Sequence, residues 1–176
     1  YYRDQLFKSM VRAVKTVEDS DEPVPARFEA ILREYQKTGF RWMKTLDKCG
    51  FGGILADDMG LGKTIQVIAL FEDTYSSGEK APSLVVCPAS LVYNWEQEIQ
   101  KFAPDLKVRS VVGTGPQRLE LLEKIKEDPS GCQILITSYD LLRRDIALYS
   151  QLDFRFQIID EAQFIKNAGT QNARAV

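Results

Sequence analysis

Apolar residues recur along this chain with two different periods, one typical of helices and the other of strands. The helical period is clearest in residues 63–76, where an apolar run follows a glycine-bearing turn. In residues 29–48 the period is interrupted at Gly39, which predicts either two short helices or one kinked helix. Ser90 is a good N-cap, and Pro116 suits a first helical position. The other predicted helices cover residues 6–17, 90–102, 116–128 and 139–148.

Short apolar runs between these helices predict strands. The run 84–87, for example, is stopped by Pro88, which is consistent with a strand buried on both faces. The predicted strands cover residues 53–56, 84–87, 108–112, 133–137 and 154–160. Because strands alternate with helices, we expect an α/β fold, a three-layer sandwich in which helices cover both faces of a mostly parallel sheet.

The acidic stretch 18–25 carries two prolines and is typical of a linker. We therefore expect residues 1–25 to form an N-terminal helix and linker, and residues 26–176 to form the α/β domain. The chain of 176 residues opens with Tyr1, which suggests a piece of a longer protein. No apolar run is long enough for a membrane span, and no signal segment opens the chain, so we expect an intracellular protein with no membrane partner.

Composition excludes several kinds of chemistry. Histidine is absent, so Ser-His and Cys-His catalytic pairs are excluded. Any acid–base catalysis must therefore use carboxylates, lysine or tyrosine. The cysteines Cys49, Cys87 and Cys132 lack CxxC spacing and are interpreted as free, mostly buried thiols. The net charge of −2 argues against a broad basic face, so any nucleic-acid contact must be local.

Residues 53–64 read as a strand, a glycine-bearing turn and a helix start, which is how a phosphate-binding loop is built. Gly60 and Gly62 allow backbone conformations in which successive N–H groups face one anion. Lys63 adds a positive charge for the β- and γ-phosphates, and Thr64 offers a hydroxyl to Mg²⁺ at the positive end of a helix macrodipole. The pattern predicts a nucleoside triphosphate with magnesium. Alternatively, the turn only caps a core helix.

Polar residues gather at the carboxyl ends of the predicted strands, where open parallel sheets bind ligands. Asp160 can hold Mg²⁺ through water while Thr64 holds it directly, and Glu161 can deprotonate the water that attacks the γ-phosphate. Alternatively, the two carboxylates only cap the next turn. We expect Lys63, Thr64, Asp160 and Glu161 to converge on one metal-bound triphosphate. Gln36 could pair with the N6 and N7 edge of adenine, although a glutamine on a helix is also often just solvated.

Five motifs, taken in this order, resemble those of the Swi/Snf-type ATPases, which belong to the superfamily-two helicases. They are the Gln36 segment, Asp57 to Thr64, Val86 to Leu91 followed by Asn94-Trp95, Thr137-Ser138-Tyr139, and Asp160-Glu161-Ala162-Gln163. Asp57 stands where the general phosphate-binding loop has glycine, and it matches the family's own version. Gln163 stands where many relatives carry histidine. This Asp-Glu-Ala-Gln (DEAQ) box and residues 164–167 look more like the bacterial branch, which implies the cytoplasm and association with the nucleoid.

The resemblance implies a P-loop NTPase lobe of the RecA-like type, truncated before its last strands. It implies ATP hydrolysis with Mg²⁺, coupled to translocation along double-stranded DNA and to remodelling of proteins bound to it. The nucleotide-binding residues carried over from the family are Gln36, Asp58, Met59, Gly60, Leu61, Gly62, Lys63 and Thr64.

Further roles are carried over from the family in the same way. Lys63, Asp160 and Glu161 would be catalytic, and Thr64 and Asp160 would hold the metal. The residues implied to contact the DNA backbone, without reading its sequence, are Pro88, Ser90, Thr137 and Ser138.

The family also has a second lobe with an arginine finger, which can be worth about 10³ to 10⁵ in rate. We therefore expect this chain alone to bind Mg-ATP weakly and to hydrolyse it hardly at all. Two other interpretations remain open. A DEAD/DEAH-type RNA helicase lobe would share the phosphate site but prefer RNA and separate strands. A nucleotide-gated interaction module would dock a partner through the helix at residues 1–17.

Overall fold

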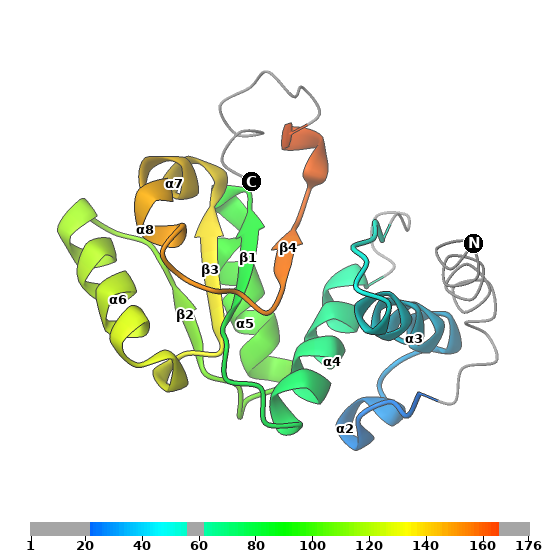
Figure 1. Cartoon of the computed structure of the whole chain (residues 1–176). Coiled ribbons are helices and arrows are strands. Elements are labelled where there is room, and N and C mark those ends of the chain that lie inside the picture. Colours follow the sequence, from blue (N-terminus) through cyan, green and yellow to red (C-terminus); the bar gives the residue numbers. More distant parts are fainter. Residues whose placement is uncertain (1–21, 56–61, 166–176) are drawn as a thin grey trace, which may run out of the picture. The chain divides into compact units, whose positions relative to one another are not determined.

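The computed structural model describes residues 22–55 and 62–165. The chain divides into two compact units, Tyr1–Ser77 and Gly78–Val176, whose elements are labelled in Figure 1. The predicted helix at residues 6–17 lies outside the described residues, as does most of the predicted phosphate-binding loop. The predicted domain boundary after residue 25 stays a prediction.

The described part of the first unit is helical. Helices α2, α3 and α4 cover Ala26–Glu29, Glu34–Lys48 and Lys63–Ser76, and α3 packs against α4. The predicted helix at residues 63–76 is confirmed, and its apolar run is buried continuously from Val67 to Phe71.

The expected break at Gly39 is wrong, because one continuous helix, α3, covers residues 34–48. Of the predicted range 29–48, only Glu29 belongs to another helix, as the last residue of α2. The backbone N–H of Arg33 donates to Gln36 Oε1 at 2.9 Å at the start of α3, so the glutamine side chain caps the residue that precedes the helix. Gly39 lies inside α3, where a Cβ atom would lie 1.9 Å from Oε1 of Gln66 on α4. This glycine therefore marks a close approach between two helices and not a helix end.

The predicted strand at residues 53–56 is wrong for the residues that are described. Residues 51–55 form no strand, and Ile54 is 83% exposed. A strand needs a neighbouring strand that satisfies its backbone hydrogen bonds, and residues 51–55 do not belong to the described sheet. An apolar run alone does not provide that neighbour.

The second unit is built on a parallel sheet with the strand order β2-β3-β1-β4. Leu84 of β1 aligns with Leu135 of β3 and with Gln157 of β4, and in Figure 1 all four arrows point the same way. The carboxyl ends of the strands therefore lie at one edge, and the predicted parallel α/β fold is confirmed. The strands are β1 (Ser83–Cys87), β2 (Val108–Ser110), β3 (Ile134–Ser138) and β4 (Gln157–Ile159).

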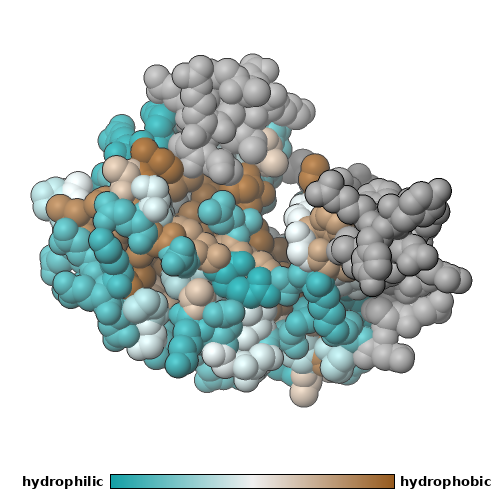
Figure 2. Space-filling view, viewed as in Figure 1, coloured by the Kyte–Doolittle hydropathy of each residue, from teal (hydrophilic) through white to brown (hydrophobic). Residues whose placement is uncertain are grey.

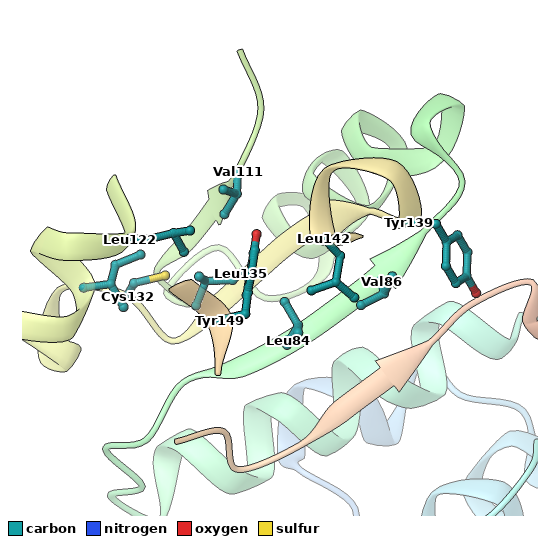
Figure 3. Packing of buried hydrophobic residues seen from close by; sticks show 10 residues of the cluster. Leu84, Val86, Val111, Leu122, Cys132, Leu135, Tyr139, Leu142 and Tyr149 are labelled. Atoms are coloured by element: carbon teal, nitrogen blue, oxygen red, sulfur yellow. The ribbon is translucent and has the colours of Figure 1, made fainter. Parts of the chain in front are cut away.

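Helices cover both faces of this sheet (Figure 1). Helix α5 (Val92–Phe102) packs against β2 and β3 on one face, and α6 to α8 lie on the other. These three helices are α6 (Gly115–Glu127), α7 (Tyr139–Arg144) and α8 (Ile146–Tyr149). Figure 3 shows the core between them and the sheet, where Leu84 and Val86 of β1 meet Leu122, Leu142 and Tyr149. Since side chains alternate along a strand, Val85 and Cys87 point to the opposite face of the sheet.

Two local predictions for the second unit are wrong. Ser90 lies within the short 3₁₀ helix η2 (Ala89–Leu91), so it is not the N-cap of α5, whose N-cap Leu91 has no capping side chain. The predicted helix at residues 139–148 is divided at Asp145, whose carboxylate accepts two hydrogen bonds from Arg118 at 2.6 and 3.1 Å.

Hydrophilic residues cover α6 in Figure 2, whereas apolar residues are visible near α7 and α8. A cavity of about 190 Å³ lies at this face, and no described site residue lines it. The prediction of free cysteines is confirmed, with Cys87 and Cys132 buried and Cys49 half-buried. Among the residues that the structure describes, no helix has the length and apolar character needed to cross a bilayer.

Candidate functional site

The phosphate half of the candidate site lies at the start of α4 in the first unit. Gly62 precedes the helix in a left-handed conformation, with φ +71° and ψ 47°, which a side chain would disfavour. Lys63 and Thr64 are the first two helical residues, and their N-cap, Gly62, has no side chain that could cap the N–H groups of this turn. Such N–H groups, together with the helix macrodipole, suit an anionic ligand.

Two glutamines lie against this turn. A Cβ atom on Gly62 would lie 2.4 Å from Nε2 of Gln36, and Nε2 of Gln66 donates to the Gly62 carbonyl at 3.4 Å. Gln36 is 7% exposed, and its oxygen accepts the N–H of Arg33. Reading adenine would therefore require that oxygen to share or exchange a partner. The adenine-binding role of Gln36 stays a prediction.

Four predicted nucleotide-binding residues, together with Asp57, lie outside the described residues, so their roles stay predictions. They are Asp58, Met59, Gly60 and Leu61.

The carboxylate half lies at the end of β4 in the second unit. The N–H of Asp160 donates to the Val86 carbonyl at 2.8 Å, which continues the pairing of β4 with β1. The Asp160 carboxylate accepts the indole N–H of Trp95 at 2.9 Å on Oδ2 and the N–H of Glu161 at 2.9 Å on Oδ1. The side chain is thus fixed at the carboxyl edge of the sheet, where the sequence places it.

Glu161 has φ +52°, and among the described residues it is the only non-glycine with a positive φ. Such a conformation costs on the order of 1 kcal/mol, so the surrounding bonds must hold it. Its carboxylate accepts a hydrogen bond from the Gln163 amide. Strained backbone of this kind clusters at functional sites, which fits the predicted catalytic role of Glu161.

Tyr139 holds Asp160 from a second direction. Its hydroxyl donates to the Asp160 carbonyl at 2.6 Å, and Figure 3 shows its ring pointing toward the end of β4. Burial, with the nearby charge of Asp160, raises the pKa of Tyr139 to about 12, so the hydroxyl keeps its proton at neutral pH. The same two causes raise the pKa of Cys87 to about 12.

The residues predicted to contact DNA follow β1 and β3 and differ in exposure. Ser90 is exposed and Pro88 is half-buried. Thr137 is fully buried, and its hydroxyl donates to the Val111 carbonyl at 3.5 Å. Ser138 is 4% exposed and caps α7 by accepting the N–H of Leu141. Of these side chains, the Ser90 hydroxyl is therefore the most accessible to a phosphate in this conformation.

The donor set fits magnesium and a nucleotide. Carboxylate and hydroxyl oxygens, as in Asp160 and Thr64, are ligands that Mg²⁺ accepts, and the left-handed Gly62 leaves backbone N–H groups for phosphate. No group of three or more Cys, Asp or Glu side chains that could hold a metal occurs among the described residues. The two halves belong to different units, so the convergence of Lys63 and Thr64 with Asp160 and Glu161 stays a prediction.

Sequence reasoning overlooked three supporting residues. In the sequence, Trp95 and Tyr139 are recognised only as parts of family motifs, and Gln66 has no predicted role. The signal for Trp95 and Gln66 was a polar group on an otherwise apolar buried face, because such a group needs a hydrogen-bond partner. The partner itself could not be read from the sequence, since Trp95 and Asp160 are 65 residues apart.

Comparison with known proteins identifies the family. The SNF2-related domain matches residues 35–176. The putative ATP-dependent helicase/translocase YwqA of Bacillus subtilis is 40% identical over 171 residues, covering 96% of this chain and 18% of that protein. An uncharacterized ATP-dependent helicase of Mycoplasma genitalium is 46% identical over 145 residues, covering 82% of this chain and 14% of the relative. This chain thus spans less than a fifth of either relative.

A solved structure supports the same assignment. The Sulfolobus solfataricus SWI2/SNF2 ATPase core in complex with dsDNA matches with a TM-score of 0.72 and 43% identity, covering 82% of this chain and 29% of that one. Its match to the parallel sheet and its helices confirms a RecA-like fold. Since the matched domain covers most of its length, this chain belongs to the SNF2-related family of ATPases.

Proposed function

We propose that this chain provides part of the ATP-binding lobe of a motor that hydrolyses ATP to translocate along double-stranded DNA and to remodel proteins bound to it. The observation that carries the proposal is the helix start of α4 at Lys63 and Thr64, directly after the left-handed Gly62, in a chain of the SNF2-related family. We further infer a second lobe in the same protein and a bacterial, nucleoid-associated location. The relatives in Bacillus and Mycoplasma support the bacterial branch.

Each described site residue has a role in this proposal. The Lys63 ammonium and the N–H groups at the start of α4 would bind the phosphates, and the Gln36 amide would pair with adenine. Thr64 and Asp160 would hold Mg²⁺, which when bound would neutralise charge on the transferred phosphoryl group. Glu161 would orient the attacking water and take its proton, which requires its carboxylate to be ionised and held in place.

DNA binding would depend on local contacts. The exposed hydroxyl of Ser90, beside Pro88 and the carboxyl edge of the sheet, can donate to a phosphate without reading the base sequence. Such contacts do not need a broad basic face, which agrees with the net charge of −2. The name of the Sulfolobus structure states that this ATPase core was in complex with dsDNA, which favours duplex DNA as the track.

The experiment is an ATPase assay of the intact protein with duplex DNA, with RNA and without nucleic acid. Glu161→Gln keeps the size of the side chain but removes the base, so we expect DNA-stimulated turnover to fall by about 10² to 10⁴ while Mg-ATP binding persists. Glu127→Gln is the matched control, because Glu127 is exposed at the end of α6.

Two results would contradict the proposal. Unchanged turnover in Glu161→Gln would remove Glu161 from the chemistry and favour a nucleotide-gated interaction module. Stimulation by RNA but not by duplex DNA would favour an RNA helicase lobe. Loss of activity in Glu127→Gln as well would show that the assay reports general damage.

A further inference from the structure

Trp95 makes a contact that packing alone does not require. It lies on α5, is 3% exposed, and donates its indole N–H to Asp160 Oδ2 at 2.9 Å. A buried indole N–H needs an acceptor, and a carboxylate is among the strongest acceptors available. Because this acceptor is the carboxylate proposed to hold Mg²⁺, the bond also bears on the candidate site.

The bonds to Asp160 restrain both its side chain and its backbone. Trp95 binds one carboxylate oxygen, and the N–H of Glu161 binds the other. The Tyr139 hydroxyl holds the carbonyl of the same residue at 2.6 Å. With one donor on each oxygen, the carboxylate is oriented but keeps further lone pairs for a ligand.

The two side-chain donors, Trp95 and Tyr139, lie in the segments that carry the predicted DNA contacts. Helix α5 follows η2, which contains Ser90, and Tyr139 is the first residue of α7, directly after Ser138. A displacement of either segment would therefore act on Asp160 through one hydrogen bond.

We propose that Trp95 is a positioning residue that orients the Asp160 carboxylate through its indole N–H, and that α5 thereby connects the Ser90 segment to the metal-binding group. This inference rests on the proposed role of Asp160 in holding Mg²⁺. It assigns Trp95 no contact with nucleotide or metal. Partners of this kind orient a ligand, and their loss typically lowers metal affinity or activity by about 10- to 100-fold.

The test is the Mg²⁺ dependence of nucleotide binding, measured in the intact protein with a fluorescent ADP analogue. Trp95→Phe keeps an aromatic ring but removes the N–H. We expect the Mg²⁺ concentration at half-saturation to rise by about tenfold, with metal-free binding of the analogue unchanged. Tyr93→Phe in α5 is the matched control, because it also removes a polar hydrogen from an aromatic residue of the same helix. Tyr93 is 62% exposed, so this change should leave both quantities unaltered.

Asp160→Asn separates this inference from the proposed function. In that background the effect of Trp95→Phe on Mg²⁺ dependence should disappear, because the carboxylate is gone. If Asp160→Asn alone leaves the Mg²⁺ dependence unchanged, the proposed metal role fails, and the inference fails with it. If Asp160→Asn changes it and Trp95→Phe does not, only the inference is overturned. If Trp95→Phe weakens metal-free binding of the analogue as much as binding with Mg²⁺, the inference is also overturned, since that result indicates a packing role.

Trp95→Tyr provides a second variant if Trp95→Phe folds poorly, because it also removes the indole N–H but keeps a polar aromatic ring. We expect the Mg²⁺ requirement to rise in the same direction. An unchanged requirement in Trp95→Tyr would overturn the inference.

Discussion

Gly39→Ala should destabilise the protein, although alanine favours helices over glycine. Gly39 lies inside α3, so the exchange should by itself stabilise the helix by about 1 kcal/mol. The new methyl group would lie 1.9 Å from Gln66 Oε1 and 3.1 Å from its Cδ. Gln66 is fully buried in α4 and has little room to move, and overpacking of this kind costs about 1–3 kcal/mol. The expected net effect is a loss of about 1 kcal/mol.

The displacement of the Gln66 side chain in Gly39→Ala should also disturb the phosphate half of the site. Gln66 donates to the Gly62 carbonyl at 3.4 Å, so an α4 side chain that must shift disturbs the turn in front of Lys63. We therefore expect weaker ATP binding as well as lower stability. Chemical denaturation of the intact protein measures the first effect, and titration with a fluorescent nucleotide measures the second.

Two variants make this reasoning refutable. Gly115→Ala is the control, because Gly115 is the first residue of α6 and a Cβ there would meet no atom within 4 Å. It should be neutral or slightly stabilising. Gly39→Ala combined with Gln66→Ala should be more stable than the sum of the single effects predicts, because the second change removes the clash. A stabilising Gly39→Ala, or an additive pair, would refute the close approach.

Three further predictions follow from single groups. Gly62→Ala places a side chain at φ +71° and against the Gln36 amide, so we expect a cost of about 1–2 kcal/mol and ATP affinity lower by about 5- to 30-fold, measured by nucleotide titration. Among the thiols of this chain, Cys49 should react quickly with a thiol reagent at pH 8, whereas Cys87 and Cys132 should react only on unfolding. Mass spectrometry of the labelled peptides will show the order. Burial raises the pKa of Cys87 to about 12 and of Cys132 to about 11, so their contribution to stability is complete below about pH 9 and is lost as the pH rises toward 12. Denaturation at pH 8 and pH 10.5 should show this decline, and equal stabilities would contradict it.

Elements with strong local signals were predictable from the sequence. Helix α4 matches its prediction at both ends, and β1 and β3 each lie within one residue of their apolar runs. In these segments the period, the turn residues and the burial all agree, so no tertiary contact has to override them. The chemistry at the end of β4 was predictable for the same reason, because parallel strands bring their carboxyl ends to one edge.

The predictions that failed depend on contacts between two segments of the chain. The run 53–56 has the composition of a strand, but pairing depends on a neighbour that its own residues cannot specify. In the sequence Gly39 suggests a helix break, but the glycine is explained by the close approach of Gln66 on another helix. Trp95 reads as a core residue, and its bond to Asp160 depends on a strand 65 residues away. Local patterns carry no information about such partners.

Gln163 shows how a departure from a family pattern can be interpreted physically. Its amide donates to Glu161, whose backbone is held at φ +52°. An amide has no pKa in the accessible range, whereas a histidine at this position would gain or lose its charge between about pH 5 and 8. The donor that holds Glu161 here is therefore neutral and independent of pH. It restrains the carboxylate without adding a positive charge beside it. If Glu161 is the base that accepts a proton from water, this neutral partner fixes its geometry at every accessible pH.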